Sequence, residues 1–232
     1  MASVYFNTTT DNLYATANLP ADTTTYTVMG WAKFAQLDAA DRQLFSFQNA
    51  SNQLVHLVSR PSGGLLYATC DNFTGYTTGQ GLTLTTWFCW ALVVSAAGAG
   101  GARFRVRPDG AGSWTNAGTC TVTDFTASRT RIVIGDYGGQ TALAYHRYVR
   151  MWDAELDETA LSLEFASNVP VRAANLLRDM RLAGSAAATT DSANGYTMTL
   201  TGTLGADGDD PTSPVSPASG TATMGRCIYI LP

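Results

Sequence analysis

Charged residues are scarce in this sequence. They make up 14% of the 232 residues, and Lys33 is the only lysine. Acidic residues outnumber Lys and Arg by 18 to 14, which gives a formal net charge of −4. A nucleic-acid-binding protein would carry a basic stripe. We therefore expect no nucleic-acid partner.

Long apolar runs are also absent. The longest strand-like run, Trp87–Val94, is far shorter than the roughly 20 residues that a transmembrane helix needs. The first residues, Met1–Phe6, have neither the basic nor the apolar segment of a secretory signal. We expect a protein that is made in the cytosol without general export, and that has no membrane partner.

Cysteines are few and lie far apart. Cys70, Cys89, Cys120 and Cys227 form no C-x-x-C pair, which argues against a zinc site. In a reducing cytosol we expect four free thiols, with disulfides as the less favoured alternative.

Catalytic patterns are sparse as well. The only histidines are His56 and His146, no G-x-S-x-G motif occurs, and we expect structural roles for both rings. Glu155 and Asp157 could share a strand face, as the paired carboxylates of a glycoside hydrolase require. However, acidic residues also stabilise the start of a helix, and we favour a capping role for Asp157. We expect a protein that is not an enzyme and has no cofactor.

The Trp87–Val94 run is the most informative feature that is present. Its length suits a buried strand, which needs a packed layer on each face. Turn residues recur about every 8 to 12 positions, as in a β-sandwich. We predict a core around Trp31, Trp90 and Val93, one helix at about 155–167, and strands at residues 4–6, 13–15, 26–34, 43–48, 54–59, 65–70, 87–94, 103–107, 131–135, 145–152, 175–182, 196–200 and 227–231.

Several segments together resemble the laminin-G-like, concanavalin A-like jelly-roll domains. They are Thr25–Lys33, Thr86–Ala91, Phe104–Gly110, Ile132–Gly135, Tyr148–Trp152 with Leu156, Asn175–Leu177, Asp191 and Gly195–Gly202. Arg147 departs from the family, which often has an acidic residue there. The resemblance implies an all-β fold: a two-sheet antiparallel jelly-roll sandwich with one short helix, in a domain at 1–204. We expect a surface loop or linker at 205–220, and at 221–232 a C-terminal strand packed on the domain or on a partner.

Two kinds of binding site are conceivable in the loops. Calcium prefers oxygen ligands, for which the weak candidates are Asp71, Asp136, Asp207 and Asp209, although solvated loop acids are the simpler interpretation. Glycan binding would use aromatic faces beside hydrogen-bonding groups. The candidates are Trp114, Asn116, Tyr137, Tyr76 and Asn72, unless these rings pack over the ends of the sandwich.

The first functional hypothesis comes from the resemblance and the missing export signal together. This jelly roll usually acts outside cells, and an unexported single domain resembles accessory proteins of tailed bacteriophages. We predict a virion surface protein, either a head decoration or a tail adhesion component, made in the host cytoplasm. Its partners would be other virion proteins, copies of itself or a cell-surface glycan, with docking through Ile228, Tyr229, Ile230 and Leu231. The alternative is a lectin module unrelated to a virion, and a glycoside hydrolase is less favoured.

Overall fold

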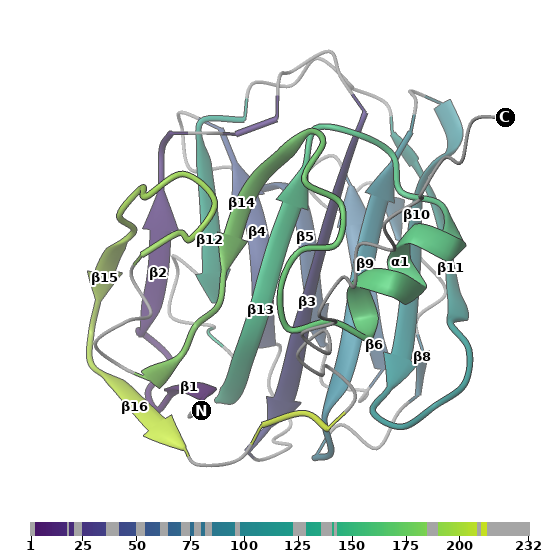
Figure 1. Ribbon diagram of the computed structural model, residues 1–232. Coiled ribbons are helices and arrows are strands. Elements are labelled where there is room, and N and C mark those ends of the chain that lie inside the picture. Colours follow the sequence, from purple (N-terminus) through teal and green to yellow (C-terminus); the bar gives the residue numbers. More distant parts are fainter. Residues whose placement is uncertain are drawn as a thin grey trace, which may run out of the picture.

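The computed structural model describes residues 3–17, 19–20, 25–35, 42–49, 54–60, 65–70, 75–76, 80–81, 85–95, 98–122, 129–135, 141, 143–184, 190–207 and 210–212. For residues 54–60, 65, 67, 70, 75–76, 80–81 and 206–207 it describes the backbone alone. Two antiparallel sheets face each other as a sandwich (Figure 1). The predicted all-β jelly-roll fold is therefore confirmed.

Sheet A contains the longest strands. Its spatial order is β11 (Thr115–Val122), β10 (Gly98–Pro108), β9 (Phe88–Val94), β3 (Tyr26–Phe34), β13 (Ala144–Trp152), β1 (Ser3–Phe6) and β16 (Leu204–Asp207). Strand β1 pairs with the first half of β13, and β14 (Leu176–Met180) pairs with its second half. Each of these pairings is antiparallel.

Sheet B lies behind sheet A in Figure 1. Its spatial order is β15 (Thr199–Thr201), β2 (Asn12–Ala15), β12 (Arg131–Gly135), β4 (Arg42–Gln48), β5 (Leu54–Arg60), β6 (Leu65–Cys70) and β7 (Gly75–Tyr76). The short strand β8 (Gln80–Gly81) also pairs with β6. Residues 202–203 join β15 to β16, so the chain passes from one sheet to the other at this side of the sandwich.

The larger apolar cluster fills the space between the sheets. Its aromatic contacts include the ring of Phe45, whose centroid lies 5.4 Å from that of Trp90 and 5.2 Å from that of Phe47. Gly30 is needed beside Trp90, because a Cβ atom at this position would lie 2.9 Å from the indole ring. Other members of the cluster include Phe6, Phe34, Phe104, Ile132, Ile134 and Met151.

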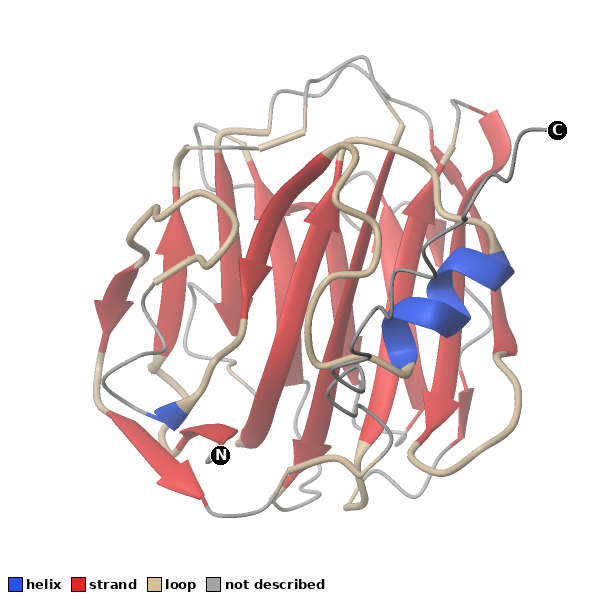
Figure 2. Ribbon diagram, in the orientation of Figure 1, coloured by secondary structure: helices blue, strands red, loops and turns tan. Residues whose placement is uncertain are grey.

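A second apolar cluster lies on the outer face of sheet A, beneath helix α1 (Glu158–Phe165). The Trp31 and Phe165 ring centroids are 4.6 Å apart, and Figure 2 shows the helix lying across this sheet. Sheet A is thus buried on both faces, which explains the uninterrupted apolar run in β9. The prediction is corrected in one respect: Trp31 and Val93 are buried, but they belong to this outer cluster and not to the core around Trp90.

The acidic run before α1 has a structural role. Asp157 has an extended backbone, and its carboxylate accepts a hydrogen bond of 2.8 Å from the Ala160 amide. Glu155 pairs with Arg103, and Glu158 pairs with Arg105, both from β10. The capping interpretation is confirmed. The helix is shorter than predicted because Asp157 terminates it at the N-terminal side.

Three sequence predictions need correction or lie beyond the described residues. Strand β11 lies where no strand is predicted, and most of β16 lies in the predicted loop at 205–220. The expected strand at 227–231, which includes Ile228, Tyr229, Ile230 and Leu231, lies outside the described residues.

The cysteines differ from the expectation of four free thiols. Cys120 is disulfide-bonded, to a partner whose side chain the structure does not describe. Cys89 is free and fully buried in β9, and this burial raises the pKa of its thiol. The prediction is therefore wrong for Cys120, whereas Cys89 is a free thiol as expected and packs as a small apolar residue.

Candidate functional site

The outer face of sheet B is the candidate site. Leu13, Ala15, Phe45, Phe47, Ile132 and Ile134 point into the core, so the residues that alternate with them point away from it. A single row then crosses the sheet by register, which we call the outer row: Thr199, Tyr14, Val133, Ser46, Leu57, Thr69 and Tyr76. Gln48 and Arg131 are paired with each other two residues along the strands from Ser46 and Val133, and therefore lie on the same face.

The composition of sheet B sets this face apart from the rest of an acidic protein. Among the strands of sheet B that the structure describes, the sequence contains Arg42, Arg60 and Arg131 but neither Asp nor Glu. Of these arginines, Arg131 shares the outer face with the hydroxyl-bearing and aromatic residues of the outer row. Ser46, Val133 and Thr69 at the centre of the row are buried, so the accessible part of this face lies at its edge, where Tyr14 and Arg131 are half-buried and Thr199 is exposed. This edge offers a ring face and hydrogen-bond donors to a ligand.

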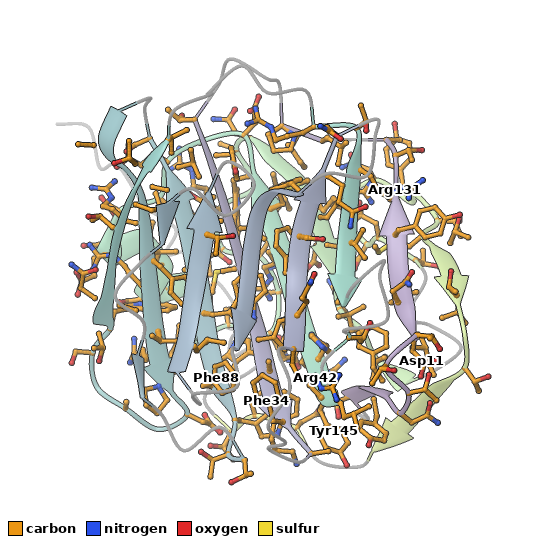
Figure 3. The ribbon with its side chains drawn as sticks, turned by 180° about the vertical axis from the view of Figure 1, so that it is seen from behind. Asp11, Phe34, Arg42, Phe88, Arg131 and Tyr145 are labelled. Atoms are coloured by element: carbon orange, nitrogen blue, oxygen red, sulfur yellow. The ribbon has the colours of Figure 1, made fainter. Side chains whose placement is uncertain are left out.

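Tyr14 and Arg131 form the half-buried part of the site. The Arg131 guanidinium carbon lies 4.9 Å from the centre of the Tyr14 ring. Figure 3 views the molecule from the side of sheet B, with Arg131 labelled at the start of β12. This cation–π contact fixes the orientation of the ring, because the ring face attracts the guanidinium.

Gln48 is buried beside them and has incomplete hydrogen bonding. Its side-chain amide nitrogen donates to Ser46 Oγ over 3.3 Å, while its backbone carbonyl accepts from the Thr130 amide over 2.9 Å. Its Oε1 atom has no hydrogen-bond partner among the described residues. An unpaired buried acceptor costs about 1–3 kcal/mol. We therefore expect a water or a ligand hydroxyl to donate to Oε1 in solution.

Comparison with known proteins gives a fold and no sequence family. No family model matches the chain, and no curated protein does. A heptameric pentraxin from Limulus polyphemus is 16% identical, with a TM-score of 0.56, and the match covers 88% of this chain and 94% of the pentraxin. A proposed carbohydrate-binding protein from Bacteroides ovatus is 13% identical, with a TM-score of 0.60 and coverage of 89% and 60%.

A third solved structure matches a smaller part of a larger protein. The extracellular region of zebrafish Gpr126 is 13% identical, with a TM-score of 0.55, and the match covers 92% of this chain but 27% of that region. The chain has a concanavalin A-like fold. At these identities the likeness is one of fold alone.

The concanavalin A-like sandwich places the predicted glycan residues in different parts of the molecule. The side chain of Trp114 is only 7% exposed, and its ring packs edge-on against Phe165 at 5.8 Å. The expectation that Trp114 offers its face in a loop is therefore wrong. Asn116 is exposed on β11, where its Oδ1 accepts from the Gly118 amide over 3.0 Å.

The remaining predicted glycan residues belong to sheet B or to the segments that follow its strands. Tyr76 ends the outer row by register, whereas Asn72 and Tyr137 lie outside the described residues. Strands β6 and β12 run in opposite directions, so the segments that follow them start at opposite ends of the sheet. Asn72 follows β6 and Tyr137 follows β12, so the two are not predicted to share one site.

The calcium candidates gain no support from the described part of the chain. Asp207 lies in β16, where it pairs in register with Ser3, and Asp71, Asp136 and Asp209 lie outside the described residues. Within the described ranges, no three His, Cys, Asp or Glu side chains come together to hold a metal ion. The same ranges contain no helix that is long and apolar enough to cross a membrane.

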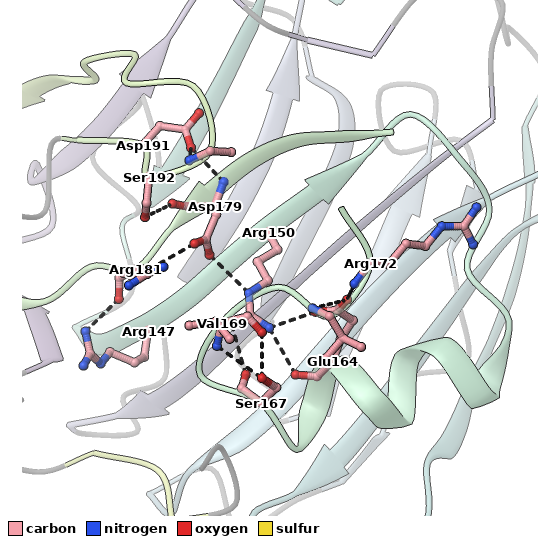
Figure 4. Close-up of polar contacts among 12 residues, drawn as sticks. Arg147, Arg150, Glu164, Ser167, Val169, Arg172, Asp179, Arg181, Asp191 and Ser192 are labelled. Carbon is pink, nitrogen blue, oxygen red and sulfur yellow. Dashed lines mark hydrogen bonds and ion pairs between the residues drawn. The ribbon is translucent and has the colours of Figure 1, made fainter. Parts of the chain in front are cut away.

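A buried ion network braces sheet A against the helix (Figure 4). Arg150 pairs with Glu164 at 3.0 Å and with Asp179 at 3.2 Å, and it also donates to the Ser167 carbonyl. Glu164 in turn accepts from the Arg172 amide over 2.6 Å. All three charged side chains are nearly inaccessible to solvent. This network is therefore part of the framework and cannot contact a ligand.

Arg147, the departure from the family pattern, also has a structural role. Its guanidinium is buried, pairs with Asp210 at 2.9 Å and donates to the Arg181 carbonyl over 2.8 Å. Residue 210 is thereby held against β13. The basic residue at this position closes a salt bridge with the chain beyond β16.

His146 lies between the sheets and has no catalytic partner. Its ring contacts Phe6 with centroids 4.9 Å apart, and within the described ranges neither ring nitrogen has a hydrogen-bond partner. Burial lowers the pKa of His146 to about 3. A general base needs a reachable proton and an orienting group. The structure therefore agrees with a structural role for His146, and the side chain of His56 is not described.

Proposed function

We propose that this protein is a non-enzymatic carbohydrate-binding module whose ligand binds on the outer face of sheet B. The observation that carries the proposal is the arrangement of Tyr14, Arg131 and Gln48 described above. A pyranose can pack its C–H face on a tyrosine ring, while amide and guanidinium groups hydrogen-bond its hydroxyls. A ligand hydroxyl that donates to the unpaired Gln48 Oε1 would bind more tightly, because it completes the hydrogen bonding of a buried acceptor.

Two further observations support the proposal. The Bacteroides ovatus protein with the same fold is a proposed carbohydrate-binding protein, which makes this function one that the fold can carry. Cys120 forms a disulfide, and disulfides persist in oxidising environments, where extracellular glycans are found. The virion role and docking through Ile228–Leu231 stay predictions.

The structural roles of Glu155 and Asp157, the two acids of the hydrolase alternative, support a non-enzymatic function. Asp157 caps α1 and Glu155 is paired with Arg103, so the two acids of the hydrolase alternative are both engaged in structure. A retaining or inverting hydrolase needs two acids free to face the sugar.

Binding of the purified protein to a glycan array, followed by titration of the best sugar, tests the proposal. We expect Tyr14→Ala to weaken binding about tenfold or more, equivalent to about 1.4 kcal/mol, because the ring platform is lost. Tyr5→Ala is the matched control, since Tyr5 is also a half-buried strand tyrosine but stacks on Tyr145 in sheet A. It should bind as the wild type does.

Two results would contradict the proposal. The first is a wild-type protein that binds no sugar on the array. The second is equal loss of binding in Tyr14→Ala and Tyr5→Ala, which would indicate a general loss of stability rather than of a binding surface.

A further inference from the structure

A second surface feature lies at the segment before β15. The Asp191 amide donates to the Tyr196 carbonyl over 2.9 Å, and the Gly195 amide donates to the Asp191 carbonyl over 2.8 Å. Gly195 has a φ of +70°, which favours glycine. This tight turn leaves Asn194 exposed and Tyr196 43% exposed. Asn194 Nδ2 donates to the Leu177 carbonyl over 2.7 Å, which holds its side-chain amide in place, two residues before the aromatic ring.

A buried ion pair lies beside the Tyr196 ring. The Arg178 guanidinium carbon is 5.9 Å from the ring centre, and both Arg178 and Asp191 are fully buried. Asp191 Oδ1 accepts from the amides of Asp179 and Ala193, at 2.8 and 2.9 Å. The outer oxygen, Oδ2, faces Arg178.

The ion pair is too long to be a hydrogen bond. Arg178 Nη1 and Asp191 Oδ2 are 3.7 Å apart, whereas charge-assisted bonds of this kind are about 2.7–2.9 Å long. Arg178 Nη2 donates to the Ala17 carbonyl, but among the residues that the structure describes Nε, Nη1 and Asp191 Oδ2 have no hydrogen-bond partner. Two donors and one acceptor are therefore unpaired in one buried cluster.

The unpaired atoms indicate which ligand groups can complete the hydrogen bonding of the cluster. A hydroxyl both donates and accepts, so it can bond Asp191 Oδ2 and Arg178 Nη1 at once. An anion would be repelled by the Asp191 carboxylate, and a cation by the Arg178 guanidinium. The pair as a whole is neutral and favours a neutral hydroxyl group.

The Tyr196 side chain lies between the buried Arg178 guanidinium, 5.9 Å away, and solvent, to which it is 43% exposed. Exposed side chains change rotamer within picoseconds to nanoseconds, so the ring can turn aside without rearrangement of the turn. A sugar hydroxyl could then reach Arg178 and Asp191, while the ring packs on the sugar. The Tyr196 ring would thus shield Arg178 and Asp191 in the free protein and pack against the sugar ring in the complex.

We propose that Tyr196, Asn194 and the Arg178–Asp191 pair form a second sugar subsite, which takes a neutral pyranose through its hydroxyl groups. The subsite shares no residue with the outer face of sheet B, because Arg178 belongs to β14 of sheet A. The subsite proposal depends on the proposed function in one respect, namely that the protein binds sugars.

Chemical-shift titration of the isotope-labelled full chain tests the subsite. The ligands are methyl α-mannoside, methyl β-galactoside and methyl β-glucoside. We expect at least one to shift the amide signals of residues 191–197 in a saturable way. Asp191→Asn should weaken this binding about tenfold, since Oδ2 becomes a donor, while Oδ1 can still hold the turn. Tyr196→Ala should weaken it as well, and Tyr5→Ala, whose ring stacks on Tyr145 in sheet A, should leave it unchanged.

Three outcomes would overturn the inference. One is the absence of saturable shifts at residues 191–197 while amides of sheet B respond, which would mean that water alone fills the cluster. Another is wild-type affinity in Asp191→Asn when the amide signals show an intact turn. The third is no response to sugar anywhere in the protein, which would remove the proposed function together with the subsite.

Discussion

Replacing Arg150 with leucine should destabilise the protein by about 3–5 kcal/mol, because it would remove the counter-charge that two buried carboxylates share. Neither Glu164 nor Asp179 can reach solvent, and Asp179 would keep its pair with the half-exposed Arg181, whose Nε lies 3.1 Å from Asp179 Oδ2. Arg150 also bonds the carbonyls of Glu164 and Ser167, at 3.2 and 3.0 Å. Loss of the side chain therefore removes the side-chain link from β13 to the end of α1, while the backbone ladder between β13 and β14 stays.

The matched control is Arg105→Leu. Arg105 also pairs with an acid of the helix segment, but Glu158 is half-exposed, and surface pairs contribute about 1 kcal/mol or less. Urea unfolding of the wild type and both variants measures the difference as a change in midpoint at constant slope. Similar losses in the two variants would show that burial does not set the cost of breaking the Arg150 pairs.

Acidification should destabilise the wild type more than a His146→Leu variant. The pKa of His146 is about 3 in the folded protein, against 6.5 for an ordinary histidine, so the unfolded state binds more protons between these values. Stability from this residue is complete above pH 6.5 and is lost as the pH falls toward 3. The slope is about 1.4 kcal/mol per pH unit, which amounts to about 4 kcal/mol at pH 3.

The measurement is the free energy of unfolding of both proteins at several pH values between 7 and 3. Subtracting one curve from the other cancels the carboxylates, which the two proteins share. The difference should move by about 4 kcal/mol in favour of the leucine variant. A difference that does not change with pH would mean that His146 can be protonated without leaving its place between the sheets.

The strands and the helix could be predicted from the sequence wherever apolar residues form an uninterrupted run or recur with a clear strand or helix period. The Trp87–Val94 run and the alternation in residues 26–34 defined the two central strands of sheet A. Asp157 marked the start of the helix, because its carboxylate caps it. The sequence pattern could not show which layer covers each face of sheet A. Trp31 and Trp90 are both fully buried, yet they lie on opposite sides of sheet A.

The missed strands and site residues have a common physical cause. Strand β11 is rich in Thr, Gly and Asn, so its period-2 signal is weak although Ala117, Cys120 and Val122 point inward. Tyr14, Gln48 and Arg131 are polar or aromatic residues in ordinary strands, and only the pairing of distant strands makes them neighbours. The Asn194-Gly195 pair before Tyr196 was the one local signal for an exposed aromatic turn.

The most direct test of carbohydrate binding is a map of where the sugar touches the protein. The best sugar from the array, added to the isotope-labelled wild type, should shift backbone amides of β2, β4 and β12 around Tyr14, Gln48 and Arg131. Shifts confined to the outer face of sheet A, or no shifts at a concentration that saturates the array signal, would contradict the outer face of sheet B as the binding surface.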